Sequence, residues 1–141
     1  MFFASQIWQM EESSKTMDHC SILIVEDEES IRQLYQMMLE IENYNVLLAS
    51  NGQEALEKLE KCPNLPCLVI LDLMMPVMNG WQFVEAVKKV KEYADIPIIV
   101  VTAFRDKADT IKANGFMLKP IELDQFLKVV GKYCRHRKNT K

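Results

Sequence analysis

Five residues with reactive or charged side chains each follow an apolar run of this chain. They are Glu26, Asp27, Asp72, Thr102 and Lys119. Carboxylates can bind a divalent cation or act as nucleophiles, whereas a hydroxyl and an ammonium can bind the oxygens of an anion. If the fold brings these residues together, they could form one reactive or ligand-binding site. Each also has an ordinary explanation, as a turn former, a helix-entry charge, a strand-end hydroxyl or a surface cation.

The elements that carry these residues alternate along the chain. Short apolar runs predict five strands, at 21–25, 44–49, 68–72, 98–102 and 116–118. Helical spacing of apolar residues predicts helices that begin near Ser30, Gly52, Trp81, Asp106 and Leu123, the fourth of them over 106–113. Such alternation favours a parallel sheet with helices on both faces, because parallel strands need crossover connections. We therefore expect an α/β, flavodoxin-like doubly wound fold with strand order 2-1-3-4-5.

In open sheets of this kind, ligands bind outside the carboxyl ends of the strands. All five residues would then lie on one rim. It would be a coincidence for five residues with only ordinary structural roles to gather on that rim, so we interpret them as one site.

Composition narrows the possible functions. The 141 residues suit one domain, and the net charge of -3 disfavours a charge-driven nucleic-acid binder. The four cysteines include no Cys-x-x-Cys pair and no zinc-like spacing, so we expect reduced thiols, no disulfide and a cytoplasmic location.

The two ends of the sequence differ from its middle. Residues 1–16 read as a loosely ordered extension that is too short to span a membrane and lacks the basic start of a signal peptide. Docking of Phe2, Phe3, Ile7 and Trp8 on a partner or on the domain itself stays open. Residues 17–134 form the expected domain, and residues 135–141 are a basic tail that most simply remains solvated.

Four segments resemble the receiver domain of two-component response regulators, in particular the single-domain, chemotaxis-type members. They are Ile22–Glu28, Leu71–Gly80, Val100–Ala103 and Leu118–Pro120. The resemblance covers about 20–134, nearly the whole chain, and all four segments fall in order at strand ends.

The resemblance implies a role for each site residue. Asp72 would be the phospho-acceptor, supplied by a histidine kinase or a phosphotransfer protein. Glu26, Asp27, Asp72 and the backbone carbonyl of Met74 would hold Mg²⁺, with Mn²⁺ as a substitute. A cation is needed because close carboxylates repel one another by about 4 kcal/mol per pair at an effective dielectric near 20.

The other implied roles concern the phosphoryl group and the response to it. Thr102, Ala103 and Lys119 would bind the phosphoryl oxygens, and a cis Lys119–Pro120 bond would aim the lysine at the site. Thr102 and Phe116 would form the switch that converts phosphorylation into a surface change. Met74 and Phe104 flank the path of an attacking water without orienting it, so we expect slow self-dephosphorylation.

Two departures from the family pattern are visible. Glu26 replaces the more common Asp, which the family accepts. The segment 102–119 is several residues short, which puts the usual output and dimer surface in doubt.

The resemblance implies a stand-alone signalling protein that accepts a phosphoryl group, rather than an enzyme. It would act on a downstream target protein, as a monomer or as a phosphorylation-linked homodimer. Neither nucleic acid nor a membrane is expected as a partner. The alternative is a phosphorylation-independent interaction module, which the short segment modestly favours. A phosphate-ester hydrolase is disfavoured because no second acid follows Asp72 at the required spacing.

Overall fold

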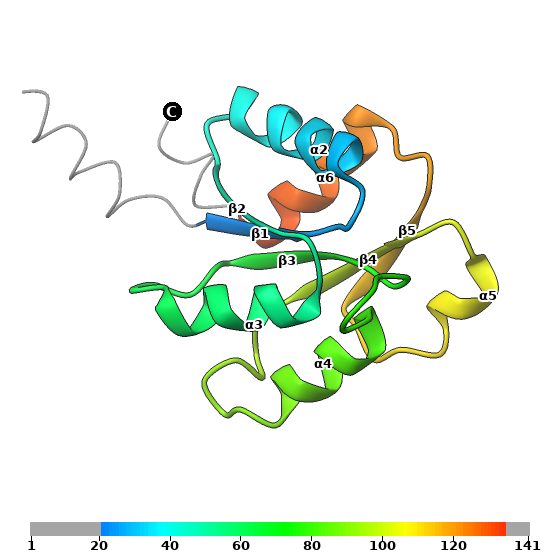
Figure 1. Ribbon diagram of the computed structural model, residues 1–141. Coiled ribbons are helices and arrows are strands. Elements are labelled where there is room, and N and C mark those ends of the chain that lie inside the picture. Colours follow the sequence, from blue (N-terminus) through cyan, green and yellow to red (C-terminus); the bar gives the residue numbers. More distant parts are fainter. Residues whose placement is uncertain (1–20, 135–141) are drawn as a thin grey trace, which may run out of the picture.

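The computed structural model describes residues 21–134, which form a five-stranded parallel sheet covered by helices (Figure 1). The strand order is β2-β1-β3-β4-β5. The strands are β1 (Ser21–Val25), β2 (Asn45–Ala49), β3 (Leu68–Asp72), β4 (Ile98–Thr102) and β5 (Gly115–Leu118). The helices are α2 (Glu29–Ile41), α3 (Gly52–Lys61), α4 (Gly80–Lys88), α5 (Arg105–Ala108) and α6 (Leu123–Tyr133). The predicted fold class and strand order are confirmed.

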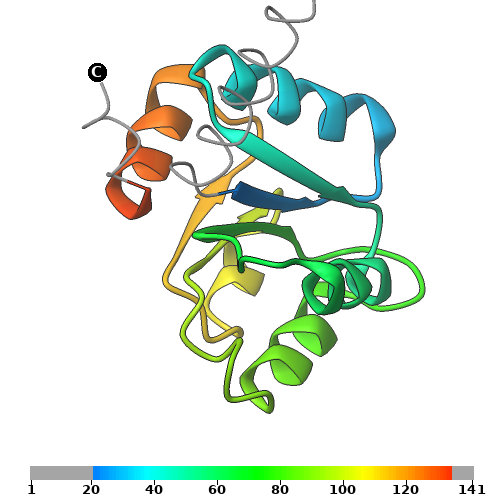
Figure 2. The same ribbon diagram turned by 90° about the vertical axis from the view of Figure 1, so that its left-hand side faces the viewer.

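The core lies in two layers, one on each side of the sheet. Helices α2 and α6 pack on one face around Leu39, Ile70 and Phe126, and helices α3 and α4 pack on the other around Leu59 and Phe83. The two layers are visible above and below the sheet in Figure 1, and Figure 2 shows them from the side. Strands β3 and β4 are buried along their whole length, as expected for central strands covered on both faces. The site residues at their ends are therefore held by a rigid scaffold.

Side chains of asparagine begin the two helices on the second face. Asn51 accepts a hydrogen bond from the Glu54 amide at 2.9 Å at the start of α3. Asn79 and Gln82 cap α4 reciprocally, each side chain bonding the other's backbone amide at 2.9 Å. These caps satisfy amides that have no partner within the helix, and so fix where each helix starts.

The fourth predicted helix was wrong in its length. It was expected over 106–113, whereas α5 ends at Ala108. Thr110 lies beyond that end and accepts a hydrogen bond from Trp81 Nε1 at 2.8 Å, while the Asn114 side chain accepts one from the Ile98 amide at 2.8 Å. These tertiary contacts hold the chain in an irregular path that leads directly into β5.

The prediction that the cysteines would be unpaired was also wrong. Cys67, just before β3, and Cys134, just after α6, form a disulfide across a sequence separation of 67 residues. Spacing along the chain could not reveal this pair, because it is the fold that brings the start of β3 next to the end of α6. Cys62 is free.

Two of the sequence-based expectations concern parts of the chain outside residues 21–134. These are the extension at 1–16 and the basic tail at 135–141. Among the described helices, none is both long and apolar enough to cross a membrane.

Candidate functional site

The carboxyl edge of the sheet brings all five predicted site residues together. Glu26 and Asp72 are 2% and 7% exposed and Thr102 is 1% exposed, whereas Asp27 is open to solvent. One carboxylate oxygen from each of Glu26, Asp27 and Asp72 lies within 4.8 Å of the others. Three acidic groups this close, two of them buried, form an all-oxygen donor set that suits a hard divalent cation.

Lys119 reaches into the acidic cluster from the end of β5. Its Nζ donates a hydrogen bond to Glu26 Oε1 at 3.0 Å and lies 3.6 Å from Asp72 Oδ1. Burial lowers the pKa of Lys119, but the hydrogen bond to Glu26 and the charge of Asp72 outweigh burial and raise it overall. The side chain is therefore a fixed cation beside Asp72.

The pKa values of the two buried carboxyl groups are raised as well, but for a carboxyl group a raised pKa disfavours the charged form. Burial and the neighbouring charge of Glu26 raise the pKa of Asp72 to about 7, although Lys119 opposes the shift. Burial also raises the pKa of Glu26, against the hydrogen bond from Lys119. Charge on these carboxylates is thus costly without a further cation, which fits a site that holds a metal ion.

Arg32 supports the acidic loop and was not identified from the sequence. Its guanidinium donates to the backbone oxygens of Glu26 at 2.8 Å and Asp27 at 3.4 Å. The Glu28 amide also donates to Glu26 Oε2 at 3.1 Å. An arginine one helical turn into α2, after an acidic triplet, was the available signal, but arginines are common on exposed helices.

The loop after Asp72 depends on a close backbone approach. A Cβ on Gly80 would lie 2.8 Å from the Asp72 carbonyl oxygen, and the Gly80 amide donates to Leu73 at 2.9 Å. Glycine therefore allows α4 to begin directly against the end of β3. Gly52 plays a similar part, because its Cβ would meet the Met78 side chain at 2.7 Å.

The ends of β4 and β5 are joined through the backbone. The Lys119 amide donates to the Thr102 carbonyl oxygen at 2.8 Å, and the Lys119–Pro120 bond is cis, as expected. Thr102 Oγ1 accepts a hydrogen bond from the Phe104 amide at 3.1 Å. The Thr102 hydroxyl is thus hydrogen-bonded within the loop that follows β4, beside the acidic cluster.

Three apolar residues singled out from the sequence are about half exposed. Met74 is 49%, Phe104 46% and Phe116 43% exposed. Met74 and Phe104 lie on the loops that follow Asp72 and Thr102, and Phe116 lies on the last strand of the sheet. None of the three belongs to the packed core.

An apolar groove opens beside Lys119 and was not foreseen from the sequence. It has a volume of about 410 Å³ and runs between the first turns of α2 and the loop that leads into α6. Its lining residues are Ile31, Leu34, Tyr35, Ala103, Lys119, Pro120 and Ile121. The groove joins the predicted phosphoryl-binding residues Ala103 and Lys119 to an exposed part of α2.

The comparison with protein families identifies the class of this chain. The model of the response regulator receiver domain matches residues 22–131. The chain belongs to this family.

Individual relatives agree with the assignment. The chain is 32% identical over 125 residues to an uncharacterised 14.6 kDa protein of Leptolyngbya boryana, covering 85% of this chain and 94% of that protein. It is 35% identical over 111 residues to the response regulator ArlR of Staphylococcus aureus, covering 75% of this chain and 48% of ArlR. The chain thus spans about half the length of ArlR.

Solved structures show the same fold. The chemotaxis response regulator CheY4 of Vibrio cholerae superposes with a TM-score of 0.73 at 32% identity, covering 82% of this chain and 98% of CheY4. The receiver domain of the sensor kinase PA1611 of Pseudomonas aeruginosa gives a TM-score of 0.75 at 21% identity, covering 82% and 97%. That structure holds a magnesium ion in its active-site cleft.

Proposed function

We propose that this chain accepts a phosphoryl group on Asp72 and passes the event to a partner protein as a change of surface. The observation that carries the proposal is the setting of Asp72, which is 7% exposed, within 3.6 Å of the Lys119 ammonium and beside two further carboxylates. A carboxylate nucleophile for phosphoryl transfer needs a polar site in which a cation such as Lys119 can offset the charge of the incoming group.

The transfer step is a substitution at phosphorus. An Asp72 oxygen attacks the phosphoryl group of a phosphohistidine donor, an oxygen–phosphorus bond forms, and the nitrogen–phosphorus bond breaks. The histidine nitrogen keeps the bonding pair and takes up a proton. Lys119 stabilises the charge on the transferred oxygens, with Thr102 and the Ala103 amide as hydrogen-bond donors.

Mg²⁺ fits the acidic cluster, and Mn²⁺ could replace it. Asp27 and Asp72 would supply carboxylates, Met74 its backbone carbonyl, and Glu26 a contact through water. When bound, the ion neutralises the carboxylates and the incoming phosphoryl oxygens. The raised pKa of Asp72 supports this assignment, because a buried carboxylate that resists ionisation gains most from a neighbouring cation.

The response to phosphorylation involves Thr102 and Phe116. Once Asp72 is modified, the Thr102 hydroxyl exchanges its bond with the Phe104 amide for one to the phosphoryl group. Phe116, now 43% exposed, turns into the space that Thr102 leaves. A local charge event thereby biases a two-state element.

Release of the phosphoryl group by water is proposed to be slow. Met74 and Phe104 stand on the loops beside Asp72 and carry no group that could orient a water molecule. Apart from this reaction and its own phosphorylation, the chain is proposed to catalyse nothing.

The proposed partners are a histidine kinase or a phosphotransfer protein as donor and a target protein as receiver of the signal. Residues 17–134 would be the working domain of a stand-alone regulator, as a monomer or a phosphorylation-linked homodimer. A cytoplasmic location suits donors charged from ATP.

A phosphorylation-independent interaction module is the second candidate. The observation that favours it is the short α5 of four residues, which changes the surface that other receivers use for output. The two candidates differ in whether Asp72 is ever modified.

The deciding experiment is incubation with Mg²⁺ and acetyl phosphate, followed by intact-mass measurement. We expect one phosphoryl adduct that requires the metal, persists for minutes and is absent in Asp72→Asn. Asp95→Asn, an exposed acid at the opposite edge of the sheet, is the matched control and should keep the adduct. Metal binding without any adduct would favour the interaction module.

A further inference from the structure

Helix α2 is apolar on two sides. Its inward side buries Tyr35, Met38 and Leu39 in the core. Its outward side exposes Leu34, Met37 and Ile41, which are 49%, 58% and 69% exposed. A surface helix normally presents polar residues to water, as α3 does with Gln53, Glu57 and Glu60, so the outward side of α2 is unusual in this fold.

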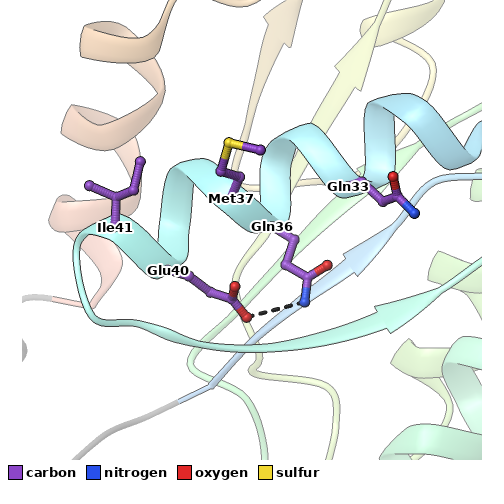
Figure 3. Close-up of a pocket in the computed structure, with 5 residues that line it drawn as sticks. All are labelled: Gln33, Gln36, Met37, Glu40 and Ile41. Atoms are coloured by element: carbon purple, nitrogen blue, oxygen red, sulfur yellow. Dashed lines mark hydrogen bonds between the residues drawn. The ribbon is translucent and has the colours of Figure 1, made fainter.

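The three exposed residues form one continuous stripe, which we call the α2 stripe. They are spaced at i, i+3 and i+7, so they share one side of the helix. A shallow pocket of about 540 Å³ follows the second half of the stripe, lined by Gln33, Gln36, Met37, Glu40 and Ile41. Figure 3 shows Met37 and Ile41 pointing away from the strand below the helix, with a hydrogen bond of 3.1 Å between Gln36 and Glu40 beside them.

The other end of the stripe reaches the functional site. Leu34 is also part of the apolar groove that contains Lys119 and Pro120. A chain segment that covers the stripe would therefore lie against one wall of the approach to Asp72.

We propose that the first ten residues of this chain pack on the α2 stripe. This segment, MFFASQIWQM, has apolar and aromatic residues at positions 2, 3, 7 and 8 and no charged side chain. Such a segment is costly to expose to water, and so is the stripe. The contact would bury both apolar surfaces together.

The point of attachment makes this contact reachable. The described chain begins at Ser21, which pairs in register with Asn45 of β2. Helix α2 ends at Ile41, shortly before Asn45, so the stripe starts near the place where the preceding segment joins the sheet. The intervening residues 11–20 can span about 30 Å when extended, and the 13 residues of α2 are about 20 Å long. The whole stripe is therefore within reach.

Tryptophan fluorescence tests the contact directly, because the full chain has only two tryptophans, Trp8 and Trp81. Trp81→Phe leaves Trp8 as the single reporter. We expect its emission to lie to the blue of that of the urea-unfolded chain, and acrylamide to quench it several-fold less. Adding Met37→Glu and Ile41→Glu together should return both properties to their solvent-exposed values.

The control places a glutamate on a different exposed apolar residue. Val77 is 79% exposed, on the loop after β3, and Val77→Glu should leave the Trp8 signal unchanged. Circular dichroism of each variant verifies that the fold is intact, since all three substituted side chains are exposed.

Three results would overturn the proposal. Trp8 could emit as in the unfolded chain before any charge is added, or stay shielded when the stripe carries both glutamates, or lose its shielding on dilution, which would point to contact between two copies. None of these readouts depends on phosphorylation, so failure here leaves the proposed function of Asp72 unaffected.

Discussion

The two edges of the sheet differ in what they do for stability. The carboxyl edge collects buried like charges around Asp72, and the loop after β3 holds Val77 at a positive φ of 68°. The amino edge carries the Cys67–Cys134 disulfide and a side chain, Asn114, that ties the start of β4 to the segment before β5. The contrast suggests that stability is concentrated at one edge and the chemistry, with its electrostatic cost, at the other.

If this contrast is correct, substitutions at the two edges should change stability in opposite directions. Removing a group at the amino edge should destabilise the fold. Removing a charge or relieving strain at the carboxyl edge should stabilise it.

Loss of the disulfide should have the largest effect. A cross-link that closes a loop of 67 residues restricts the unfolded chain, and its reduction should lower the free energy of unfolding by about 3 to 4 kcal/mol. Urea unfolding with and without a reductant measures this change. Cys62→Ser is the control, because the free thiol should contribute little. Equal free energies of unfolding with and without the reductant would contradict the idea that the disulfide stabilises the amino edge.

Asp72→Asn should stabilise the metal-free protein by on the order of 2 kcal/mol at pH 8, because charge on Asp72 is costly where its folded-state pKa is about 7 and the ordinary value is 3.8. Between these two values the folded state binds the extra proton, so wild-type stability falls as the pH rises through about 7. The variant should lack this fall. Thermal unfolding in a chelator from pH 4 to pH 8 tests the expectation, with Asp95→Asn as control.

Binding of Mg²⁺ tests the electrostatic cost of the Asp72 charge in a second way. The ion should raise the melting temperature of the wild type and have less effect on Asp72→Asn, since binding to the folded state alone stabilises it. A variant that is less stable than the wild type at pH 8 without metal would contradict the idea that Asp72 carries an electrostatic cost.

Asn114→Ala should destabilise the fold by about 1 to 2 kcal/mol. The Asn114 side chain accepts a hydrogen bond of 2.8 Å from the amide of Ile98, a fully buried residue, and alanine would leave that donor without this acceptor. Denaturant midpoints provide the measurement. Asn64→Ala, on an exposed loop at the same edge, should leave the stability nearly unchanged. An equal loss of stability in both variants would argue against a specific contribution of the Asn114–Ile98 hydrogen bond.

Val77→Asn should stabilise the protein by about 1 kcal/mol. Val77 has φ of 68° at the centre of a tight turn in which the Met78 amide donates to the Pro76 oxygen at 2.7 Å. A β-branched residue is disfavoured at positive φ, where asparagine is several-fold enriched among residues other than glycine. Because Val77 is 79% exposed, little packing is lost. Val77→Ile should give no gain, and a similar gain from both would mean that backbone strain is not the cause.

The sequence predicted the sheet and the residues gathered at its carboxyl edge better than the parts that depend on distant contacts. Five apolar runs were enough to place Glu26, Asp72, Thr102 and Lys119 on one rim, because parallel strands end at the same edge. The end of α5 was not predictable from local spacing, since it depends on the contacts of Thr110 and Asn114. The same holds for the disulfide, whose partners meet only after the sheet and α6 have formed.

Support of the site by Arg32 was missed for a related reason. Its two backbone acceptors precede it by five and six residues, a spacing that has no fixed meaning until the loop between β1 and α2 has its shape. The pKa shift of Asp72 likewise reflects burial and the distance to Glu26, which the sequence alone does not contain.

Cys67 touches both ends of the described fold. Its amide donates to the Ser21 carbonyl oxygen at 2.9 Å, and its sulfur is bonded to Cys134. Residues 21 and 134 therefore meet at the edge opposite Asp72. A biotin tag or a fused carrier joined beyond residue 134 would anchor the molecule on the side away from Asp72, so that the immobilised protein would present its acidic cluster to a partner in solution.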